Sequence, residues 1–367
     1  MITEGYVGKH YSQLPTPCLL LDLDAVESNI KIMQQYLSEN TLCQLRPHIK
    51  AHKCPRLAHL QIQSGAIGIT CAKLGEAVVM AHSGIKSILI ANQVIGDEKI
   101  KVLAGLNRYS EVMPSVDSKE NIERISHWSK IFNVQIPLFI EVDIGYNRCG
   151  VRTIDEALEL AQLIGNLDNV YLKGIQAYEG RMGSNCHSYE EKMTYVKDRV
   201  GFALMVKEAL EAQGYPVEVV SNASTGTAKY TSKLTGVTEV QPGSYVLMEA
   251  AYDTEEIGLP FQQALFVLAS VCSIYKERIV LTAGEKAVTI DQGPPVLIDD
   301  PQAKTVCHEE HCLVDMTSKL KHYKVGDFVL LKPSHCCTTS NQHNYFYCVR
   351  NGIVEDIWPI SARGRCD

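Results

Sequence analysis

The sequence predicts an α/β protein that consists of a (β/α)8 barrel followed by a C-terminal antiparallel β domain. Between residues 43 and 248, short apolar runs alternate with amphipathic stretches about eight times. After about residue 256 the pattern changes to strands separated by glycine, proline and acidic turns. A length of 367 residues also exceeds one ordinary domain. We therefore place the barrel at 16–255 and the β domain at 256–367. Residues 1–15 are candidates for joining the β domain.

Eight apolar runs are the expected barrel strands. Runs of this length that alternate with helical patterns are typical of βα units and a parallel sheet. An open doubly wound sheet also fits the alternation, but no GxGxxG motif follows the first run, which disfavours a dinucleotide-binding domain. The eight runs lie at residues 43–50, 66–72, 87–94, 111–117, 136–145, 170–180, 217–224 and 238–248.

The stretches between these runs carry signals for helix ends. One predicted helix ends at Gly84, and another begins at Thr153, where Glu156 three residues later completes a capping box. In the last third of the chain, Asn351-Gly352 between two apolar runs predicts a β-hairpin. No low-complexity linker separates the two parts. We therefore expect them to share an interface that contains the functional site.

Composition and charge exclude several classes of protein. The chain has 35 basic and 42 acidic residues and no basic run, which disfavours a surface for nucleic acid or anionic membranes. The first residues lack the charged start and apolar stretch of a signal peptide, and the longest apolar run, 264–275, is too short to cross a bilayer. We expect a soluble cytoplasmic protein, and in that compartment the thirteen cysteines remain thiols, most of them buried.

Polar residues gather at the carboxyl ends of the predicted barrel strands, where barrel active sites lie. Alternation along RPHIK points Arg46, His48 and Lys50 to one side. Desolvation and neighbouring cations would favour the neutral amine of Lys50, which is the form that makes a Schiff base. The alternative is an ordinary solvated lysine in a basic loop. The other strand-end residues are Glu141, Asp143, Arg148, Gln176, Tyr178, Glu179, those of 221–227, Gln241, Gly243, Ser244 and Tyr245.

Two further segments are candidates for ligand binding. Residues 221–230, SNASTGTAKY, form a hydroxyl-rich strand-to-helix junction, which can hold a phosphate. The alternative is that the residues of this loop are small for steric reasons alone. His335 and Cys337 follow a predicted strand, where alternation would aim both the same way, and imidazole with thiolate suits zinc or a neighbouring transition metal. The alternative is a packed histidine beside two buried cysteines. The segment 307–312, CHEEHC, lacks a complete zinc-site spacing and is interpreted as a solvated turn.

Several motifs together resemble one known family. The chain carries, in this order, RPHIKAHKCP, GITCAKLGEA, EVDIGYNRCGV, GIQAYEG, EVQPGSYVLM, PSHCC and WPISARG. These motifs resemble the D-threonine aldolase and D-serine dehydratase family, metal-activated pyridoxal-phosphate enzymes with the alanine-racemase-like fold (fold type III). The resemblance runs from about Thr16 to Gly364. It implies a cofactor-binding barrel, an active site between barrel and β domain, and a homodimer.

The resemblance also implies roles for individual residues. Lys50 matches the lysine that binds pyridoxal phosphate covalently, Tyr178 matches an aromatic residue beside the cofactor ring, and Arg148 matches an arginine near the ring. Gln241 stands where racemase relatives have an arginine that faces the pyridine nitrogen. A neutral amide there implies that no strong acid protonates the ring, so that the metal would share in stabilising the carbanion. The phosphate cradle would include Thr225, Gly226, Thr227, Gly243, Ser244 and Tyr245.

His335 and Cys337 match the metal pair of the family, for zinc or manganese, with magnesium as a further option. Aldolases often have aspartate at the position of Cys337, whereas dehydratases resemble the HxC arrangement. The flanking motifs resemble those of aldolases. Aldolases also tend to have a histidine shortly after QAYxG that serves as a base. The nearest histidine here is His187, which we assign with Lys50 to catalysis.

The expected function is retro-aldol cleavage of a D-β-hydroxy amino acid such as D-threonine to glycine and an aldehyde. The alternative is β-elimination of D-serine or D-3-hydroxyaspartate to a 2-oxo acid and ammonia. Both would be lyase reactions on a small D-amino acid. An amino-acid racemase would need a second base on the opposite face, and a non-catalytic cofactor-binding protein would lack a β domain, so that both rank lower.

Overall fold

The structure, a computed structural model, describes residues 4–180, 186–252, 257–315 and 322–367. One of its two sheets contains eight parallel strands in the order β2-β9-β8-β7-β6-β5-β4-β3. Each strand falls inside one of the eight predicted runs, which confirms the predicted barrel strands. The strands are β2 (Gln44–Leu45), β3 (Ile69–Cys71), β4 (Ser87–Ile90), β5 (Glu111–Val116), β6 (Ile136–Val142), β7 (Val170–Ala177), β8 (Val219–Asn222) and β9 (Glu239–Val240).

The two ends of this sheet meet beside the chain that follows β2. A parallel bridge joins His48 to Thr70, and the backbone N–H of Thr70 donates to the carbonyl of Pro47 at 2.9 Å. The N–H of Ile67 donates to the carbonyl of Leu45, also at 2.9 Å. These bonds connect β2 to β3 and close the sheet, so that the prediction of a (β/α)8 barrel is confirmed.

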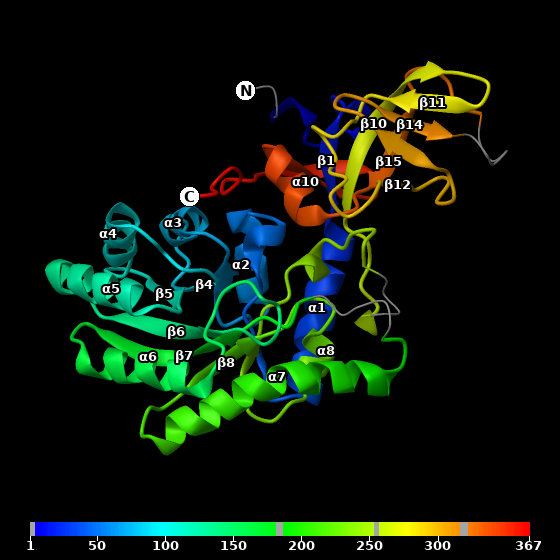
Figure 1. Ribbon diagram of the computed structural model, residues 1–367. Helices are drawn as coiled ribbons and strands as arrows, with labels where there is room; N and C mark the ends of the chain where they lie inside the picture. The colour runs from blue at the N-terminus through cyan, green and yellow to red at the C-terminus, as the bar shows by residue number, and fades with distance from the viewer. Residues whose placement is uncertain (1–3, 181–185, 253–256, 316–321) are drawn as a thin grey trace.

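Helices cover the outside of the barrel (Figure 1). Buried residues of α6 recur at Ala157, Leu160, Ala161 and Ile164, the spacing that places one apolar face against the strands. The predicted capping box of α6 is present. The helices are α1 (Leu23–Asn40), α2 (Pro55–Gln63), α3 (Leu74–His82), α4 (Asp97–Leu106), α5 (Lys119–Phe132), α6 (Ile154–Asn166), α7 (Tyr189–Ala212) and α8 (Ala228–Thr231), with short 3-10 turns η1 (Glu4–Tyr6), η2 (Tyr11–Gln13), η3 (Ile49–Ala51) and η4 (Ser244–Val246).

The second sheet lies beside one end of the barrel (Figure 1). Its strands follow the order β13-β14-β11-β10-β1-β16-β17, and β15 pairs with β10 and β12 off this path. The predicted hairpin at Asn351-Gly352 joins β16 to β17, and both residues have positive φ, at 50° and 79°. The strands are β1 (Cys18–Asp22), β10 (Leu265–Ile274), β11 (Arg278–Leu281), β12 (Val296–Leu297), β13 (Thr305–Cys307), β14 (Cys312–Asp315), β15 (Phe328–Lys332), β16 (Tyr345–Arg350) and β17 (Ile353–Pro359).

Strand β1 corrects the domain boundary at residue 16. We assigned this segment to the barrel, but β1 lies in the second sheet, antiparallel to β10 and parallel to β16. Four of its five residues are buried, so that it lacks the alternation that would show which sheet it faces. The chain therefore starts in the β domain, builds the barrel and returns.

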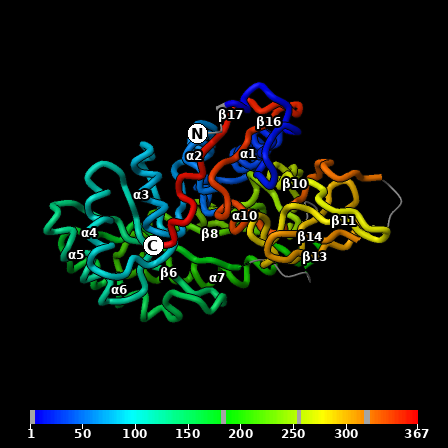
Figure 2. The backbone as a smooth tube through the Cα atoms, turned by 90° about the horizontal axis from the view of Figure 1, so that it is seen from above, coloured from blue at the N-terminus to red at the C-terminus, as the bar shows by residue number. Residues whose placement is uncertain are grey.

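Contacts at both ends of the β domain tie it to the barrel. Helix α10 (Cys336–Gln342) lies where the two parts meet (Figure 1), and the N–H of Cys336 donates to Oε2 of Glu249 at 2.7 Å. The C-terminal tail runs towards α3 (Figure 2), where the N–H of Gly75 donates to the carbonyl of Asp367 at 3.0 Å. The barrel and the β domain therefore share an interface, as predicted.

A disulfide corrects the prediction that every cysteine is a thiol. Cys307 and Cys312 are bonded, because the antiparallel register of β13 and β14 sets them opposite each other with their Cα atoms 4.0 Å apart. Sequence spacing alone does not show that pairing. The remaining cysteines of the described chain are free. Among the described residues, no helix is long and apolar enough to cross a membrane.

Candidate active site

A cavity of about 530 Å³ lies at the carboxyl ends of the barrel strands, where the β domain meets them. Cavities of this size hold small ligands. Its walls come from both parts of the chain. The lining residues are His48, Lys50, Ala72, Ala91, Asn92, Tyr146, Arg148, Gln176, Ala177, Tyr178, Asn222, Ala223, Ser224, Thr225, Gln241, Gly243, Ser244, Glu249, Tyr252, Gln292, His335 and Cys337.

Lys50 lies in the 3-10 turn η3, directly after β2, and its side chain lines the cavity. His48 lines it as well, whereas Arg46 points below the cavity into an ion pair with Glu239. The backbone pairing of β2 continues past Leu45, because the N–H groups of Arg46 and His48 donate to the carbonyls of Val240 and Pro242, both at 3.0 Å, as the predicted alternation requires. Burial, followed by the charges of Lys50 and its neighbours, lowers the pKa of His48 well below its ordinary value, so that this imidazole is neutral at pH 7.

Two tyrosines and an arginine form one wall of the cavity. The rings of Tyr146 and Tyr178 meet edge to face at 5.0 Å, and the Arg148 guanidinium lies 5.2 Å and 5.3 Å from them. Lys50 Nζ lies 5.9 Å from the Tyr178 ring centroid. Burial raises the pKa of Tyr178 to about 12, so that its hydroxyl stays protonated. Sequence reasoning missed Tyr146, although it stands two residues before Arg148 in the motif already singled out.

Three residues of the predicted phosphate cradle line the cavity, namely Thr225, Gly243 and Ser244, and the neighbouring Ser224 lines it as well. Gly243 is required by packing, because a Cβ there would lie 2.8 Å from the carbonyl oxygen of His48. Its lack of a side chain lets the backbone after β9 approach η3 closely. Small residues and backbone N–H groups at a strand-to-helix junction suit a phosphate.

The other three predicted cradle residues lie outside the described cavity lining. Thr227 Oγ1 accepts from the N–H of Ser224 at 2.8 Å, at the start of α8. Tyr245 is fully buried, and its hydroxyl accepts from Gln61 Nε2 at 2.8 Å. Gly226 faces Tyr252, with which an added Cβ would be in contact at 3.3 Å. These residues support the loop rather than face the cavity.

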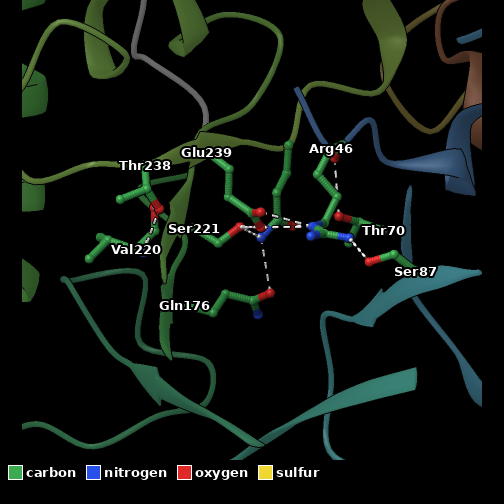
Figure 3. A network of polar contacts seen from close by, with 9 residues as sticks. Arg46, Thr70, Ser87, Gln176, Val220, Ser221, Thr238 and Glu239 are labelled. Carbon is green, nitrogen blue, oxygen red and sulfur yellow. Dashed lines mark hydrogen bonds and ion pairs between the residues drawn. The ribbon is translucent and has the colours of Figure 1, made fainter. Parts of the chain in front are cut away.

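Gln241 and Gln176, which form the floor of the cavity, belong to a network of polar contacts that continues beneath it. Figure 3 shows this network from close by. Gln241 Nε2 donates to Ser221 Oγ at 2.6 Å and to Gln176 Oε1 at 3.1 Å. Ser221 in turn donates to Glu239 Oε1 at 2.6 Å. Nε of Arg46 lies 2.9 Å from both carboxylate oxygens of Glu239. The series of hydrogen bonds that ends at Gln241 therefore begins at a buried ion pair, Arg46 with Glu239.

The same floor reaches a second buried carboxyl group. Gln176 Nε2 donates to Oε2 of Glu141 at 2.5 Å, and Arg148 Nη2 lies 3.7 Å from Glu141 Oε1. Burial raises the pKa of Glu141 to about 7, against the lowering effects of Gln176 and Arg148. This carboxyl group therefore titrates near neutral pH.

His335 and Cys337 both line the cavity, from the start of α10. The predicted strand alternation is wrong here, because His335 is the N-cap residue of α10 and Cys337 lies in its first turn. His335 Nδ1 lies 2.6 Å from Asp291 Oδ2. Asp291 also accepts from Thr338 Oγ1 at 3.0 Å. Sequence reasoning missed Asp291, which stands 44 residues away with no motif around it.

The electrostatics of the pair favour a thiolate at Cys337 beside a protonated imidazole at His335, whose proton a metal would displace. Hydrogen bonds from Cys336 and His335 outweigh burial and lower the pKa of Cys337 well below its ordinary value. Burial lowers the pKa of His335, but the Cys337 contact and Asp291 raise it overall, to about 9. No group of three or more His, Cys, Asp or Glu side chains in the described residues could hold a metal. A metal here would have two protein ligands, and water or substrate would complete its shell.

His187 does not line the described cavity. Its side chain is exposed just before Ser188, the N-cap residue of α7, and its backbone N–H donates to Glu191 Oε2 at 2.9 Å. The structure therefore does not support the predicted role of His187 as a base. That role was inferred from the short sequence distance to Tyr178, which does not determine whether the side chain reaches the cavity. The CHEEHC segment likewise lies outside the cavity lining.

The cavity nevertheless fits pyridoxal phosphate. It offers an amine at Lys50, an aromatic wall at Tyr178 and a small, hydroxyl-rich loop beside Gly243. Asn222 also lines it, and its Oδ1 atom is buried without a hydrogen-bond partner in the described structure. An orphaned polar atom of this kind indicates a missing ligand. Because the amine comes from the barrel and the imidazole–thiolate pair from the β domain, the protein is a barrel enzyme whose active site requires both parts.

Comparisons with known proteins identify the family. Residues 21–251 match the alanine racemase N-terminal domain, and residues 264–349 match a putative serine dehydratase domain. The chain is 36% identical to D-threonine aldolase of Arthrobacter sp. over 361 residues, which cover 97% of this chain and 95% of the relative. It is also 36% identical to 3-hydroxy-D-aspartate aldolase of Paracoccus denitrificans, with 98% and 94% covered. The chain belongs to the D-threonine aldolase and D-serine dehydratase family.

Solved structures agree with this assignment. The crystal structure of D-threonine aldolase from Filomicrobium marinum matches with a TM-score of 0.91 at 34% identity, and 98% of each chain is covered. D-threo-3-hydroxyaspartate dehydratase of Delftia sp. is more distant, at 28% identity over 90% of this chain and 92% of that protein. A cysteine mutant of such a dehydratase, solved in a metal-free form, matches with a TM-score of 0.84 at 25% identity, with 96% and 98% covered. The predicted family, alanine-racemase-like fold and lyase class are confirmed.

Proposed function

We propose that this protein is a lyase that uses pyridoxal phosphate and a divalent metal to cleave D-β-hydroxy amino acids to glycine and an aldehyde. The observation that carries the proposal is that Lys50, Tyr178 and the pair His335 and Cys337 line one cavity. Relatives at 36% identity over nearly the whole chain are named aldolases, and the named dehydratases are at 28% or below. That order supports carbon–carbon cleavage over elimination.

Each part of the cavity would have its own task. Bound pyridoxal phosphate supplies the electron sink for the negative charge left at Cα when a bond to that carbon breaks. Lys50 would hold the aldehyde carbon of the cofactor, and the Tyr178 ring would pack beside the pyridine. Ser224, Thr225 and Ser244 would bind the phosphate, and Gly243 would leave room for it.

The opposite end of the cavity would act on the β-hydroxyl group. His335 and Cys337 would hold a divalent metal, which lowers the pKa of a hydroxyl bound to it. Asp291 keeps His335 Nδ1 occupied, so that Nε2 is the nitrogen available to an ion. Loss of the hydroxyl proton at this end is what retro-aldol cleavage requires, because the electrons of the O–H bond then form the carbonyl of the aldehyde.

A β-elimination is the second candidate, and Cys337 is the observation that favours it. The HxC pair suits zinc, and a related dehydratase has been solved as a metal-free cysteine mutant. In that reaction Lys50 would take the α-proton and hydroxide would leave from Cβ. The final products would be a 2-oxo acid and ammonia.

Product analysis separates the two reactions. Purified protein would be supplied with the cofactor, zinc or manganese, and D-threonine, D-serine or D-3-hydroxyaspartate in turn. We expect glycine and an aldehyde in equal amounts, with the L-isomers inert as the matched control. A 2-oxo acid and ammonia without glycine would contradict the aldolase proposal.

A further inference from the structure

The orientation of the Gln241 side-chain amide is determined by its neighbours. Its nitrogen donates one hydrogen bond to Ser221 Oγ at 2.6 Å and one to Gln176 Oε1 at 3.1 Å. Figure 3 labels these two acceptors. An amide nitrogen carries two hydrogens, so that both are used. Within the described residues no hydrogen bond to the remaining atom, Oε1, is present, although Gln241 lines the cavity.

The ion pair between Arg46 and Glu239 determines this orientation of the Gln241 amide. The Glu239 carboxylate lies against Arg46, with Nε 2.9 Å from both oxygens, and an ionised carboxylate only accepts. The hydroxyl hydrogen of Ser221 is therefore committed to Glu239 at 2.6 Å. Ser221 Oγ can then only accept from Gln241, which excludes the flipped amide with its oxygen towards Ser221.

The Gln176 amide matches this orientation. Its Nε2 donates to the Glu141 carboxyl at 2.5 Å, and its Oε1 faces Gln241 and accepts the second hydrogen of the amide nitrogen. The branch through Ser221 and Glu239 therefore turns the NH2 group of Gln241 away from the cavity and its carbonyl oxygen towards it. All the residues involved are buried, so that water does not compete for these bonds.

The Gln241 oxygen can only accept a hydrogen bond, so that a ligand in the cavity must place a donor group opposite it. Pyridoxal phosphate has two ring-borne groups that can donate, the protonated ring nitrogen and the 3-hydroxyl. The 3-hydroxyl is adjacent to the carbon that Lys50 would hold, whereas the ring nitrogen lies opposite that carbon. An unprotonated ring nitrogen would set its lone pair against that of the Gln241 oxygen.

We propose that Gln241 accepts a hydrogen bond from the protonated ring nitrogen of the cofactor, and that Ser221, Glu239 and Arg46 are positioning residues that hold Gln241 in this orientation. The inference rests on the proposed function, since it needs the cofactor in this cavity. It agrees with the expectation from sequence that no strong acid protonates the ring, and it adds a neutral acceptor for the ring N–H group. A fixed neutral acceptor stabilises the N–H form without a charged acid beside it.

The test is the protonation state of the ring nitrogen in the holoenzyme. Protein loaded with pyridoxal phosphate that carries ¹⁵N in the ring would be measured by NMR, without substrate. We expect a pyridinium resonance in the wild type and in Gln241→Glu, which keeps an acceptor. Gln241→Leu should give the neutral pyridine position, and Ser221→Ala should move the resonance towards it. Ser87→Ala is the matched control, because Ser87 also binds Arg46 but not Gln241, and its spectrum should equal that of the wild type.

The outcomes separate this inference from the proposed function. A neutral pyridine resonance in the wild type, or a pyridinium resonance that persists in Gln241→Leu, overturns the inference. If Gln241→Leu does not retain cofactor, an unchanged spectrum in Ser221→Ala overturns it instead. Protein with a pyridinium resonance that cleaves none of the three D-amino acids contradicts only the proposed function. Wild-type protein that retains no cofactor contradicts both.

Discussion

Nδ1 of His335 lies 2.6 Å from Oδ2 of Asp291, a residue of the β domain that stands 44 positions earlier in the chain. A carboxylate in this position orients the imidazole and increases its basicity as a ligand. The contact occupies Nδ1 and leaves Nε2 as the nitrogen available to a further partner. It also identifies a residue that acts on the proposed metal ligands through another side chain.

Replacement of Asp291 by alanine should weaken metal binding by about 10–100-fold, the usual effect of losing such a partner. Competition with a coloured chelator would measure the affinity. Asp155→Ala, in the first turn of α6, is the matched control and should bind metal like the wild type. Equal affinity in wild type and Asp291→Ala would show that the contact does not support the site.

Lys50→Ala should abolish both turnover and the visible absorption of the bound cofactor, because it removes the amine that lines the cavity. Borohydride reduction followed by peptide mass spectrometry would locate the cofactor on Lys50 in the wild type. Lys73→Ala removes an exposed lysine at the start of α3 and should change neither. Cofactor found on another lysine would contradict the assignment.

Metal removal should stop catalysis and leave the cofactor in place, because the metal pair and Lys50 come from different parts of the chain. Dialysis against a chelator is expected to abolish turnover while the visible absorption remains. Cys337→Ala should reproduce this result, whereas Cys149→Ala, outside the cavity lining, should not. Activity that survives chelation would mean that His335 and Cys337 have another role.

The stability of the protein should depend on the ionisation of Glu141. Its pKa is raised from 4.5 to about 7 in the fold, mainly by burial, so that the folded state binds more protons than the unfolded state between these values. The free energy of unfolding therefore falls as pH rises through this window, by about 3 kcal/mol from this group. Glu141→Gln should remove that loss, and urea unfolding at pH 5 and pH 8 would measure it. The exposed Glu159→Gln should leave the pH dependence unchanged, and equal slopes in wild type and Glu141→Gln would contradict the prediction.

Gly243→Ala should impair cofactor binding and destabilise the fold by about 1–3 kcal/mol, because its Cβ would lie 2.8 Å from the His48 carbonyl oxygen. Spectroscopic titration with the cofactor and thermal unfolding would measure the two effects. Gly201→Ala, in α7 with open space around it, should be neutral or slightly stabilising. A variant at position 243 that binds cofactor normally would show that the loop can move aside.

Features specified by neighbouring residues could be predicted from the sequence. The eight barrel strands, the capping box of α6 and the hairpin at Asn351-Gly352 depend on spacing over a few residues, and the structure contains all of them. Lys50, Tyr178, His335 and Cys337 lie in short motifs and converge on one cavity. A local pattern failed where the chain changes conformation, at His335 and Cys337, which lie at the start of a helix rather than in an extended segment.

The sequence by itself therefore determined the barrel, the β domain and the main residues of the candidate site, because periodicity, capping and motif spacing are local properties of the chain. Only the tertiary structure decided that β1 joins the second sheet, that Asp291 supports His335 and that Cys307 pairs with Cys312. It also decided that the Gln241 oxygen faces the cavity. These features depend on register and on hydrogen-bond direction between segments far apart in sequence, and no single segment contains that information.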